Sequence, residues 1–581
     1  MNNMDILSTV EIKATEWLEG PYDQETKDAI KKMLENEDKT DLIESFYKDL
    51  EFGTGGLRGI MGPGSNRMNR YTVGAATQGL SNYLKKTYPN KKDIKVAIGY
   101  DCRNNSPYFA ETAANIFSAN GIEVHIFESL RPTPEMSYAI RELDCQSGII
   151  ITASHNPKIY NGYKAYWNDG SQIVAPHDKN IIDEVANIKV ENILFEPNKE
   201  LIHVMGEEMD KKFIEASHQI SMSPQSIERH KDMKIVYTPI HGTGYKMVPA
   251  ALRKFGFTNI INVPEQDVVS GEFPTVVSPN PEEAAAMEMA IAKANETGAE
   301  IVMATDPDAD RIGVCVRDDS GKFIIVNGNQ TCILFTYYLI ARNKELGRIT
   351  GKEYVVKTIV TSELIAKIAE ANNVEYFDSY TGFKFIADVI RDNEATKRYI
   401  GGGEESFGFL PSDFVRDKDA VTACALMAEI AAWAKDKGKS LFELLQDIYL
   451  EYGFSKEFMK YIVRQGKTGA EEIQEMMKNF RETPPATLGG SKLVRIKDYS
   501  TLEDKDLETG KITKMNYKST SNVLQFFTED GTKVSVRPSG TEPKIKFYFE
   551  CTSKINTRDE YHSADEKAMK RIESVMKDLG I

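Results

Sequence analysis

The stretch IKVAIGYDCRNNSPYFAETAANIFSANGIEVHIF, residues 94–127, contains two apolar, β-branched runs separated by a polar loop and a longer segment. The longer segment, SPYFAETAANIFSANG, places apolar residues at helical spacing and ends at Gly121, a residue type that often terminates helices. A strand, a helix and a second strand in this order are typical of a βαβ unit, in which the two strands run parallel.

Two further stretches repeat this order. The second runs from KIVYTP, which begins at Lys234, to NIINV, which begins at Asn259. The third runs from YVVKTI at Tyr354 to VEYFD at Val374. Repetition of one supersecondary unit indicates related domains. We therefore expect three tandem, related α/β domains, preceded by two polar helices in the first ~45 residues.

The pattern changes after about Tyr452. The segments ETPPATLGGSK and KDYSTLEDKDLETGK are polar, and we expect them to be loop and linker. LQFFTEDGTKVSVRP contains two strand-like runs around the turn signal Asp530-Gly531, KIKFYFE adds another strand, and an amphipathic helix begins near Asp559. These features predict a C-terminal α+β domain.

The length of 581 residues supports the same organisation, because about 150 residues per domain gives about four domains. The fold class is therefore α/β with an α+β domain at the C-terminal end. The expected domains are 1–207, the N-terminal extension and α/β domain I; 208–325, α/β domain II; 326–455, α/β domain III; and 456–581, α+β domain IV.

Composition excludes several classes of partner. The 72 Lys and Arg residues and 87 Asp and Glu residues give a net charge of −15, which repels nucleic acids and anionic membranes. No secretory signal is evident, and the most apolar segments are shorter than the about 20 residues of a membrane helix. The six cysteines are scattered without a CxxC pair, which favours reduced thiols and a cytoplasmic location.

The segment SGIIITASHNPKIYNGYK, residues 147–164, carries the sharpest chemical signal. Its apolar run ends abruptly before Ser154, so a buried strand delivers a hydroxyl group to an open loop. The carboxyl ends of strands in α/β sheets are where ligands bind, which suits a nucleophile or a phosphate carrier. A lone serine at such a place is more often a turn or helix cap, but His155 and Lys164 in the same segment favour chemistry.

The segment AEIVMATDPDADRIGVCVRD places Asp306, Asp308 and Asp310 at alternate positions between two strand-like runs. Three carboxylates so close together repel one another unless a cation holds them, and their hard oxygen atoms suit Mg²⁺ or Ca²⁺. An EF-hand loop is excluded, because its sixth and twelfth positions would be Arg311 and Arg317. A haloacid-dehalogenase-type aspartyl phosphatase remains a weaker alternative, since Ala309-Asp310 departs from the usual sequence after D-x-D.

Two glycine-containing segments do not support nucleotide binding. FGTGGLRG, residues 52–59, has Arg58 where a dinucleotide fingerprint needs its last glycine, although Arg58 could contact a phosphate group. RQGKTG, around Gly466, has Tyr461 where a P-loop needs its first glycine.

Three other segments offer groups suited to sugars or phosphates. GGGEESFGF provides Glu404, Glu405 and Ser406 after a glycine run, and these acceptors suit sugar hydroxyls. RPSGTEPK, residues 537–544, combines a guanidinium, two hydroxyls and a glycine in a tight turn that suits a phosphate group. TGFKF adds Lys384. Each segment alone could be an ordinary surface loop.

FGTGGLRG, TASHNPKIYNGYK, DPDADR, TGFKF, GGEESFG and RPSGTEPK occur in this order across residues 52–544, and together they resemble the α-D-phosphohexomutase superfamily. Within it, GEES followed by FG is similar to the phosphoglucomutase branch. The length and the segment FVRDKDA, Phe414–Ala420, are similar to the long bacterial phosphoglucomutases and their phosphopentomutase relatives.

The resemblance implies four domains around a central cleft and interconversion of glucose 1-phosphate and glucose 6-phosphate. It implies Mg²⁺ as a cofactor and glucose 1,6-bisphosphate as the intermediate and activator. Ser154 would be the phosphoserine, with His155, Lys164 and Arg58 as further catalytic residues. Ser154, Asp306, Asp308 and Asp310 would hold the metal ion. The implied substrate-binding residues are Arg311, Thr381, Gly382, Lys384, Glu404, Ser406, Arg537, Ser539, Gly540 and Thr541.

Several alternatives stay open at this point. A phosphopentomutase or a phosphomannomutase would use the same fold, and a sugar-phosphate phosphatase would act through Asp306. A non-catalytic sensor of sugar phosphates ranks last, because the nucleophile and the acidic triplet are both intact. The general acid and base are not identified by the sequence, although Lys164 or His155 is favoured for this role and Arg58 for charge stabilisation.

Overall fold

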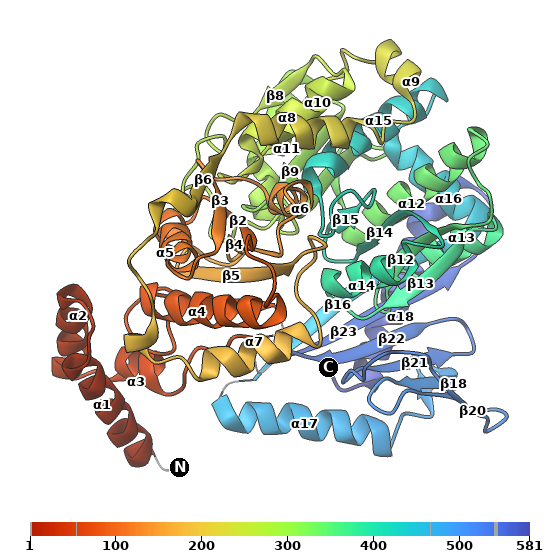
Figure 1. Ribbon diagram of the computed structural model, residues 1–581. Coiled ribbons are helices and arrows are strands. Elements are labelled where there is room, and N and C mark those ends of the chain that lie inside the picture. The colour runs from red at the N-terminus through yellow and green to blue at the C-terminus, as the bar shows by residue number, and fades with distance from the viewer. Residues whose placement is uncertain (1–2, 54, 465, 540–543) are drawn as a thin grey trace. The chain divides into compact units, whose positions relative to one another are not determined.

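The computed structural model describes residues 3–53, 55–464, 466–539 and 544–581 (Figure 1). The chain divides into two compact units. The first contains Met1–Gly328 and Gly382–Lys437, and the second contains Asn329–Thr381 and Gly438–Ile581. The predicted segment 326–455 therefore contributes residues to both units. Within the described ranges, no helix combines the length and hydrophobicity that a bilayer crossing requires.

The N-terminal extension forms three helices where the sequence indicated two. These helices share a small core, in which Val10, Ile30 and Phe46 are at most 1% exposed. The third helix has seven residues, too few to show a helical period in the sequence. The helices are α1 (Asn3–Glu19), α2 (Gln24–Glu35) and α3 (Thr40–Phe46).

Domain I contains a six-stranded sheet with the order β1-β5-β4-β2-β3-β6. Strands β2 and β3 pair in parallel, as the first βαβ stretch predicted, whereas β5 runs antiparallel to β4 and to β1. The helix α4 packs against α5 and α7. The elements are β1 (Gly56–Ile60), α4 (Arg70–Thr87), β2 (Lys95–Tyr100), α5 (Ser106–Ala119), β3 (Glu123–Phe127), α6 (Thr133–Glu142), β4 (Ser147–Ile151), β5 (Tyr160–Trp167), α7 (His177–Ala186) and β6 (Ile202–Met205).

Strand β4 is buried on both faces because helices cover the sheet on both sides, α5 on one and α6 on the other (Figure 1). Ile149 and Ile151 join the core that contains Phe117 of α5, whereas Ile150 joins the core that contains Met136 of α6. Side chains of a strand alternate between its two faces, so a continuous run of isoleucines fits this place. The strand therefore carries its last residues to a fixed edge of the sheet.

Domain II contains a five-stranded sheet with the order β11-β10-β9-β7-β8. The predicted parallel pair of the second βαβ stretch is present as β7 and β8, and β9 runs parallel to β7 and antiparallel to β10. The elements are α8 (Glu207–His218), α9 (Pro224–Arg229), β7 (Ile235–Thr238), α10 (Gly244–Phe255), β8 (Ile260–Asn262), α11 (Ala284–Thr297), β9 (Ile301–Thr305), β10 (Ile312–Arg317) and β11 (Phe323–Val326).

The first unit also contains four elements from the predicted third domain. Strands β14 and β15 form an antiparallel pair, and α15 packs against α10 and α9 of domain II. The apolar sequence of α15 is explained by this packing, because all its residues from Ala420 to Ala434 are buried. The elements are α14 (Phe383–Asn393), β14 (Arg398–Glu404), β15 (Gly408–Leu410) and α15 (Ala420–Asp436).

The second unit begins with the other elements of the predicted third domain. Strands β12 and β13 pair in parallel, as the third βαβ stretch predicted, and α13 connects them. The elements are α12 (Gly328–Glu345), whose first residue belongs to the first unit, β12 (Glu353–Thr358), α13 (Leu364–Ala371), β13 (Glu375–Ser379) and α16 (Leu441–Tyr452).

Domain IV, also in the second unit, is built on an antiparallel eight-stranded sheet with the order β16-β23-β22-β21-β18-β19-β20, in which β17 pairs with β18. The predicted hairpin around Asp530-Gly531 is present as β21 and β22, and the predicted final helix is α18. The elements are β16 (Phe454–Val463), α17 (Gly466–Glu482), β17 (Thr487–Leu488), β18 (Ser491–Asp498), β19 (Glu503–Asp506), β20 (Ile512–Lys514), β21 (Leu524–Thr528), β22 (Lys533–Pro538), β23 (Lys544–Ser553) and α18 (Tyr561–Asp578).

The segment KDYSTLEDKDLETGK, residues 497–511, which the sequence indicated as loop and linker, instead contains the end of β18 and the whole of β19, and β20 follows it directly. Backbone pairing creates these strands, with Arg495 opposite Asp506 and Lys505 opposite Ile512. The Ile512 side chain is 55% exposed, so no buried face imposes an apolar alternation on this edge of the sheet.

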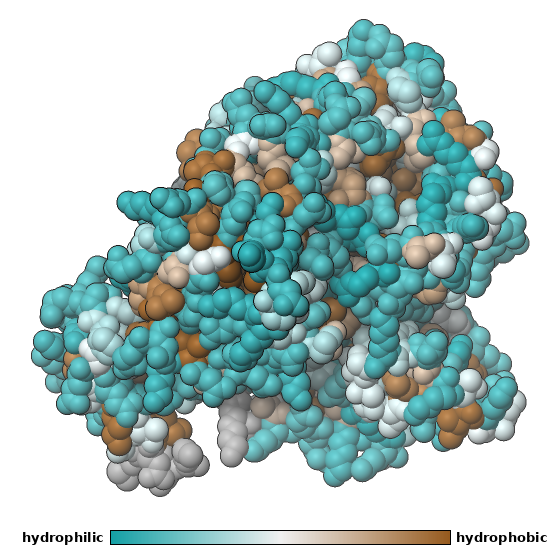
Figure 2. Space-filling model, in the orientation of Figure 1, coloured by the Kyte–Doolittle hydropathy of each residue, from teal (hydrophilic) through white to brown (hydrophobic). Residues whose placement is uncertain are grey.

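Figure 2 shows the face of the molecule in view as mainly hydrophilic, with apolar residues scattered over it.

Two neighbouring glutamates in domain IV, Glu457 and Glu550, should make the stability of the folded protein depend on pH. Ser455 Oγ lies within hydrogen-bond distance of both carboxyl groups, 2.6 Å from Glu457 Oε1 and 3.2 Å from Glu550 Oε1. Burial and the charge of Glu550 raise the pKa of Glu457 from 4.5 to about 7. The folded state thus binds this proton more tightly than the unfolded state does. Its contribution to stability is full below pH 4.5 and is lost as the pH rises toward 7.

We therefore expect Glu457→Gln to raise the Tm by about 2 °C or more at pH 8 and by less at pH 5, because glutamine is neutral at both pH values. Scanning calorimetry at the two pH values measures this difference. The exposed Glu529, changed to glutamine, serves as a control. An equal effect of Glu457→Gln at both pH values would contradict the expected titration.

Candidate active site

Ser154 lies in the loop that connects β4 to β5, beyond the buried carboxyl end of β4. Its side chain is largely enclosed, with 7% of the residue exposed. Ser154 Oγ donates a hydrogen bond of 2.6 Å to Asp306 Oδ2, and it lies 3.3 Å from His155 Nδ1. The structure thus brings the predicted nucleophile into direct contact with the predicted metal-binding triplet, although 152 residues separate Ser154 and Asp306 in the chain.

The triplet Asp306, Asp308 and Asp310 occupies the turn between β9 and β10. All three residues are at most 1% exposed, and each offers a carboxylate oxygen within 4.8 Å of the others. Asp308 Oδ1 and Asp310 Oδ1 are buried and have no hydrogen-bond partner. Buried carboxylate oxygens without a partner are costly, and a hard divalent cation would satisfy them. These residues therefore fit a metal ion.

The pKa values of the three carboxyl groups in the triplet are shifted in different directions. Burial, together with the charges of Asp308 and Asp310, raises the pKa of Asp306 well above its usual range. Burial also opposes ionisation of Asp308, but Lys164 outweighs it and holds the pKa of Asp308 below its usual range. The pKa of Asp310 is lowered as well, since Lys164 and Lys418 outweigh burial and the charge of Asp308. Two of the three carboxylates are thus kept ionised by lysines.

Lys164 projects from β5 and binds two members of the triplet. Its Nζ lies 2.7 Å from Asp308 Oδ2 and 3.2 Å from Asp310 Oδ2. The same Asp308 oxygen accepts a 2.8 Å hydrogen bond from Thr133 Oγ1, at the start of α6. Lys164 therefore places a cation at the acidic triplet, which Ser154 contacts through Asp306.

Lys418 is a second lysine at the triplet, and it was not among the predicted site residues. The residue is 7% exposed, and its Nζ lies 3.1 Å from Asp310 Oδ2 and 3.2 Å from Asp417 Oδ1. Asp417 Oδ2 in turn accepts a 2.6 Å hydrogen bond from the hydroxyl of Tyr166. The sequence feature that could have indicated Lys418 is its segment, FVRDKDA, whose charged residues directly precede the apolar helix α15.

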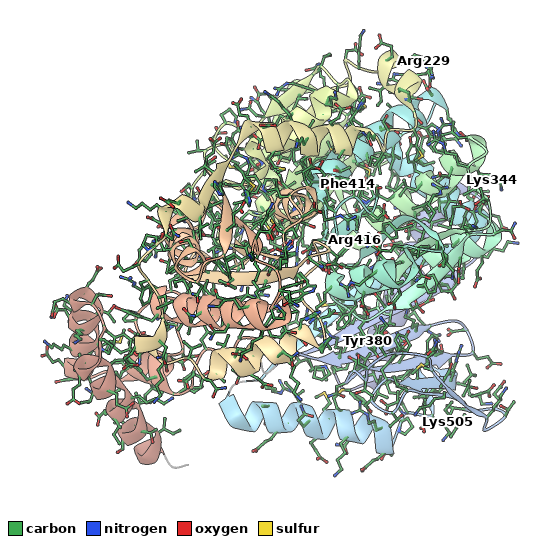
Figure 3. All side chains as sticks on the ribbon, in the orientation of Figure 1. Arg229, Lys344, Tyr380, Phe414, Arg416 and Lys505 are labelled. Atoms are coloured by element: carbon green, nitrogen blue, oxygen red, sulfur yellow. The ribbon has the colours of Figure 1, made fainter. Side chains whose placement is uncertain are left out.

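The FVRDKDA segment is fixed to domain I by two of its residues, Phe414 and Arg416, which Figure 3 labels next to α6. The Phe414 ring lies 6.1 Å from that of Tyr138, and the backbone N–H of Arg416 donates a 3.0 Å hydrogen bond to Ser137 Oγ. Tyr138 and Ser137 belong to α6. These contacts explain how a segment far along the chain brings Lys418 to the site.

The predicted sugar-binding loop, which includes Glu404 and Ser406, forms the turn between β14 and β15. The backbone N–H of Ile312 donates a 3.0 Å hydrogen bond to Phe407 O, so this turn is attached to the start of β10 next to the triplet. Glu404 is 5% exposed. Burial raises its pKa, although the nearby Lys418 acts in the opposite direction.

The other predicted residues of the first unit lie in the same loops or near them. Arg58, on β1, donates a 3.1 Å hydrogen bond to Asn156 Oδ1 in the Ser154 loop. Arg311 follows the triplet and pairs with Glu282 at 2.8 Å. Burial, and then the charges of Arg311 and Arg58, lowers the pKa of His155 well below its usual range, which favours a neutral imidazole.

Gly382 and Lys384 mark the start of α14. Gly382 has a φ of +116°, a backbone conformation that glycine adopts readily. Burial lowers the pKa of Lys384. A lysine whose charge is partly desolvated is suited to bind an anion that replaces its lost hydration.

The remaining predicted residues belong to the second unit or lie outside the described residues. Thr381 closes the loop after β13, and its Oγ1 is buried without a hydrogen-bond partner. Arg537 lies on β22, and the backbone N–H of Ser539 donates a 2.7 Å hydrogen bond to Lys544 O. Gly540 and Thr541 lie outside the described residues.

The fold and the site define an α/β enzyme in which one serine hydroxyl contacts a buried acidic triplet. Four family models match the chain, described as phosphoglucomutase/phosphomannomutase alpha/beta/alpha domains I, II and III and C-terminal domain. They match residues 49–192, 211–321, 327–452 and 465–566, in this order. The chain belongs to the phosphoglucomutase/phosphomannomutase family. The domain boundaries given from the sequence stay a prediction.

Two relatives share about a third of their residues with the chain. A phosphoglucomutase of Staphylococcus aureus strain N315 is 35% identical over 537 residues, which are 92% of the chain and 94% of that protein. A phosphoglucomutase of Staphylococcus haemolyticus strain JCSC1435 is 35% identical over 513 residues, which are 87% of the chain and 91% of that protein.

Solved structures share the fold at lower identity. The pp63/parafusin phosphoglucomutase from Paramecium, in an open form, is similar with a TM-score of 0.68 at 19% identity, covering 92% of the chain and 96% of that structure. A phosphoglucomutase/phosphomannomutase family protein from Burkholderia thailandensis is similar with a TM-score of 0.64 at 18% identity, covering 91% of the chain and 97% of that structure.

Proposed function

We propose that the protein is a phosphoglucomutase that interconverts glucose 1-phosphate and glucose 6-phosphate through a phosphoserine at position 154. The observation that carries the proposal is the 2.6 Å hydrogen bond from Ser154 Oγ to Asp306, inside a buried acidic triplet that two lysines neutralise in part. The two staphylococcal relatives named phosphoglucomutase support the choice of reaction.

Mg²⁺ is the metal ion that we propose for the site. Asp306, Asp308 and Asp310 would hold it together with Ser154, because their unpartnered oxygens suit a hard cation and Mg²⁺ is the usual partner of phosphate groups. When bound, the ion supplies positive charge that offsets the charge of the phosphoryl oxygens. Thr133 and Lys164 fix Asp308 from the side of domain I.

The chain's own residues perform the transfer in the following way. Phosphorylated Ser154 gives its phosphoryl group to the free hydroxyl oxygen of the bound hexose phosphate, and the bond to Ser154 Oγ breaks. The hydroxyl proton is taken up by a neighbouring base and returned to Ser154 Oγ. His155 is the candidate for the base, because its imidazole lies 3.3 Å from Ser154 Oγ and its lowered pKa favours the neutral form. Lys164 and Lys418 have raised pKa values, because burial is outweighed by the aspartates around them, so they are candidates for the acid that donates a proton.

The product of this first transfer is glucose 1,6-bisphosphate, which turns around and returns its other phosphoryl group to Ser154. We propose that Glu404 and Ser406 bind the sugar hydroxyls in both orientations. Arg537, Ser539, Gly540 and Thr541 would bind the phosphate group that is not reacting, with Lys384 and Arg311 as further cations. Arg58, which contacts the Ser154 loop, would stabilise the developing charge.

Lys418 gives the first test of these roles. We expect Lys418→Met to lower kcat by about 10²- to 10³-fold, the range of a lost general acid or charge stabiliser. The reason is that the change removes a buried cation 3.1 Å from Asp310. Steady-state kinetics with glucose 1-phosphate measure the effect. Lys435→Met, at the exposed end of the following helix, is the matched control, and equal activity of the two variants would exclude Lys418 from the reaction.

The substrate is tested by measuring kcat/KM for glucose 1-phosphate, mannose 1-phosphate and ribose 1-phosphate in parallel. We expect glucose 1-phosphate to have the highest value. If ribose 1-phosphate is preferred tenfold, about 1.4 kcal/mol of transition-state stabilisation, the protein is a phosphopentomutase. The same comparison identifies a phosphomannomutase.

All six cysteines are free thiols, which supports the cytoplasm as the proposed location.

A further inference from the structure

Arg103 is a fully buried cation that the proposed reaction does not use. It lies in the loop that follows β2, in the sequence Asp101-Cys102-Arg103, and its side chain is 0% exposed. Arginine is rarely buried without a specific partner, because desolvation of its charge is costly. The contacts of its guanidinium group therefore indicate what it is placed there to hold.

The guanidinium group binds four backbone carbonyls of one loop. Its Nη1 donates to Pro157 O at 3.0 Å and to Tyr160 O at 3.1 Å. Its Nη2 donates to Ser154 O at 2.6 Å and also to Asn156 O. All four acceptors belong to the Ser154 loop, residues 154–160. A planar group with donors on several sides can bind such a set, whereas the single ammonium group of lysine cannot reproduce it.

The other side of the Ser154 peptide is held by a second chain of contacts that ends at the same arginine. The backbone N–H of Ser154 donates to Thr152 Oγ1 at 2.9 Å, and Thr152 Oγ1 donates to Asp101 Oδ2 at 2.7 Å. That Asp101 oxygen lies 3.3 Å from Arg103 Nε. Both the N–H and the C=O of Ser154 are thus fixed through one buried ion pair.

This fixation matters because the backbone of Ser154 is strained. Its φ is +49°, in the left-handed region of backbone conformation that residues other than glycine rarely adopt. Such a conformation persists only where the surrounding contacts determine it, and it occurs often at reactive residues. The network of Arg103, Asp101 and Thr152 supplies those contacts. It also sets the direction of Ser154 Oγ toward Asp306.

A segment of domain II packs over one face of the guanidinium group. The ring of Phe273 lies over Arg103, with 5.1 Å between the ring centre and Cζ, and Phe273 is 1% exposed. The neighbouring Glu272 binds Asn104 Nδ2 at 2.6 Å and Lys158 Nζ at 2.7 Å. The arginine is therefore enclosed between the Ser154 loop of domain I and a segment of the domain that carries the acidic triplet.

We infer that Arg103 is a positioning residue for catalysis: through its carbonyl contacts it holds the Ser154 loop in the reactive geometry, with Phe273 fixing the guanidinium group from domain II. The inference rests on the proposed function, since it assigns Arg103 a role in phosphoryl transfer through Ser154. Arg103 acts through Ser154 and contacts neither the triplet nor the sugar loop in the contacts described above.

The test compares Arg103→Lys and Phe273→Leu with the wild-type protein and with Arg317→Lys. Arg317 is a matched control, because it also lies over a ring, that of Phe323 at 4.1 Å, and also donates to a carbonyl, Gly321 O at 2.9 Å. It lies at the opposite end of β10 from the triplet. The readouts are kcat and KM for glucose 1-phosphate, the rate at which glucose 1,6-bisphosphate phosphorylates Ser154, followed by peptide mass spectrometry, and the Tm.

We expect Arg103→Lys to lower kcat and the rate of Ser154 phosphorylation by about 100-fold, the effect of a misplacement of about 1 Å, with KM changed by less than about threefold. Phe273→Leu should lower the same two rates by about tenfold, because it leaves the carbonyl contacts in place. Arg317→Lys should leave both rates unchanged. A purely structural role would instead lower the Tm and leave the rates of the folded protein unchanged.

The inference is overturned if Arg103→Lys is folded and both rates stay within about threefold of the wild-type values. If Arg103→Lys does not fold, Phe273→Leu decides: a tenfold loss with unchanged KM supports the inference, and wild-type rates overturn it. Failure of the proposed function gives a different result. In that case the wild-type protein itself neither interconverts glucose phosphates nor accepts phosphate on Ser154.

Discussion

Replacing Ser154 by alanine should abolish the interconversion of glucose 1-phosphate and glucose 6-phosphate, with kcat falling by about 10⁴-fold or more. The reason is that Ser154 Oγ is the atom that would carry the phosphoryl group, and its 2.6 Å contact with Asp306 aligns it with the acidic triplet. A coupled assay that detects glucose 6-phosphate measures the loss. The folded state is checked by the Tm, which we expect to stay close to that of the wild-type protein.

Ser320→Ala, in the exposed turn between β10 and β11, controls for the loss of a serine in general. If Ser154→Ala retained a substantial part of the wild-type activity, phosphate would not pass through Ser154. The aspartyl alternative would then be tested with Asp306→Asn, which should abolish turnover under that mechanism. Because Asp306 is also a proposed metal ligand, Ser154→Ala is the variant that separates the two mechanisms: it spares turnover only if Asp306 is the nucleophile.

Asp308→Asn should cause the second large effect. We expect kcat/KM to fall by about 10²- to 10³-fold and the Mg²⁺ concentration for half-maximal activity to rise by at least about tenfold, as losses of metal-site groups do. Asparagine has the same size as aspartate, and its amide oxygen can still contact Thr133 and Lys164. The change nevertheless removes one negative charge from the triplet. Activity measured over a series of Mg²⁺ concentrations tests both effects.

Asp232→Asn, an exposed position in the same domain, provides the control for Asp308→Asn. The account of the triplet as a metal site would be contradicted if Asp308→Asn lowered activity without any change in the Mg²⁺ dependence. Asp308 would then act only through its ion pair with Lys164, which lies 2.7 Å away.

The regular parts of the fold could be predicted because their signals are local. The three βαβ stretches gave parallel pairs, β2 with β3, β7 with β8 and β12 with β13, since apolar runs and helical spacing are properties of neighbouring residues. Strands β18, β19 and β20 of domain IV could not be predicted in this way. Many of their residues are polar, and backbone pairing forms them: β19 pairs with β18 and β20, and β18 also pairs with β21.

The candidate site likewise combines features that the sequence predicts with features that only the folded structure reveals. Ser154 and the acidic triplet stand at abrupt ends of apolar runs, which is a local pattern, so each could be proposed from the sequence. Their contact, and the places of Lys418 and Arg103, depend on residues far apart in the chain. A buried lysine and a buried arginine look like ordinary charged residues until the groups that neutralise them are known.

The most direct test of the central claim follows labelled phosphate through the protein. The protein is incubated with ³²P-labelled glucose 1,6-bisphosphate, and one sample is digested for peptide mapping while another is chased with unlabelled glucose 1-phosphate. We expect about one label per chain on Ser154 and its rapid transfer to sugar phosphates in the chase, because the phosphoserine is an intermediate. A protein that turns over glucose 1-phosphate without label on Ser154, or whose label is not chased, would contradict the claim.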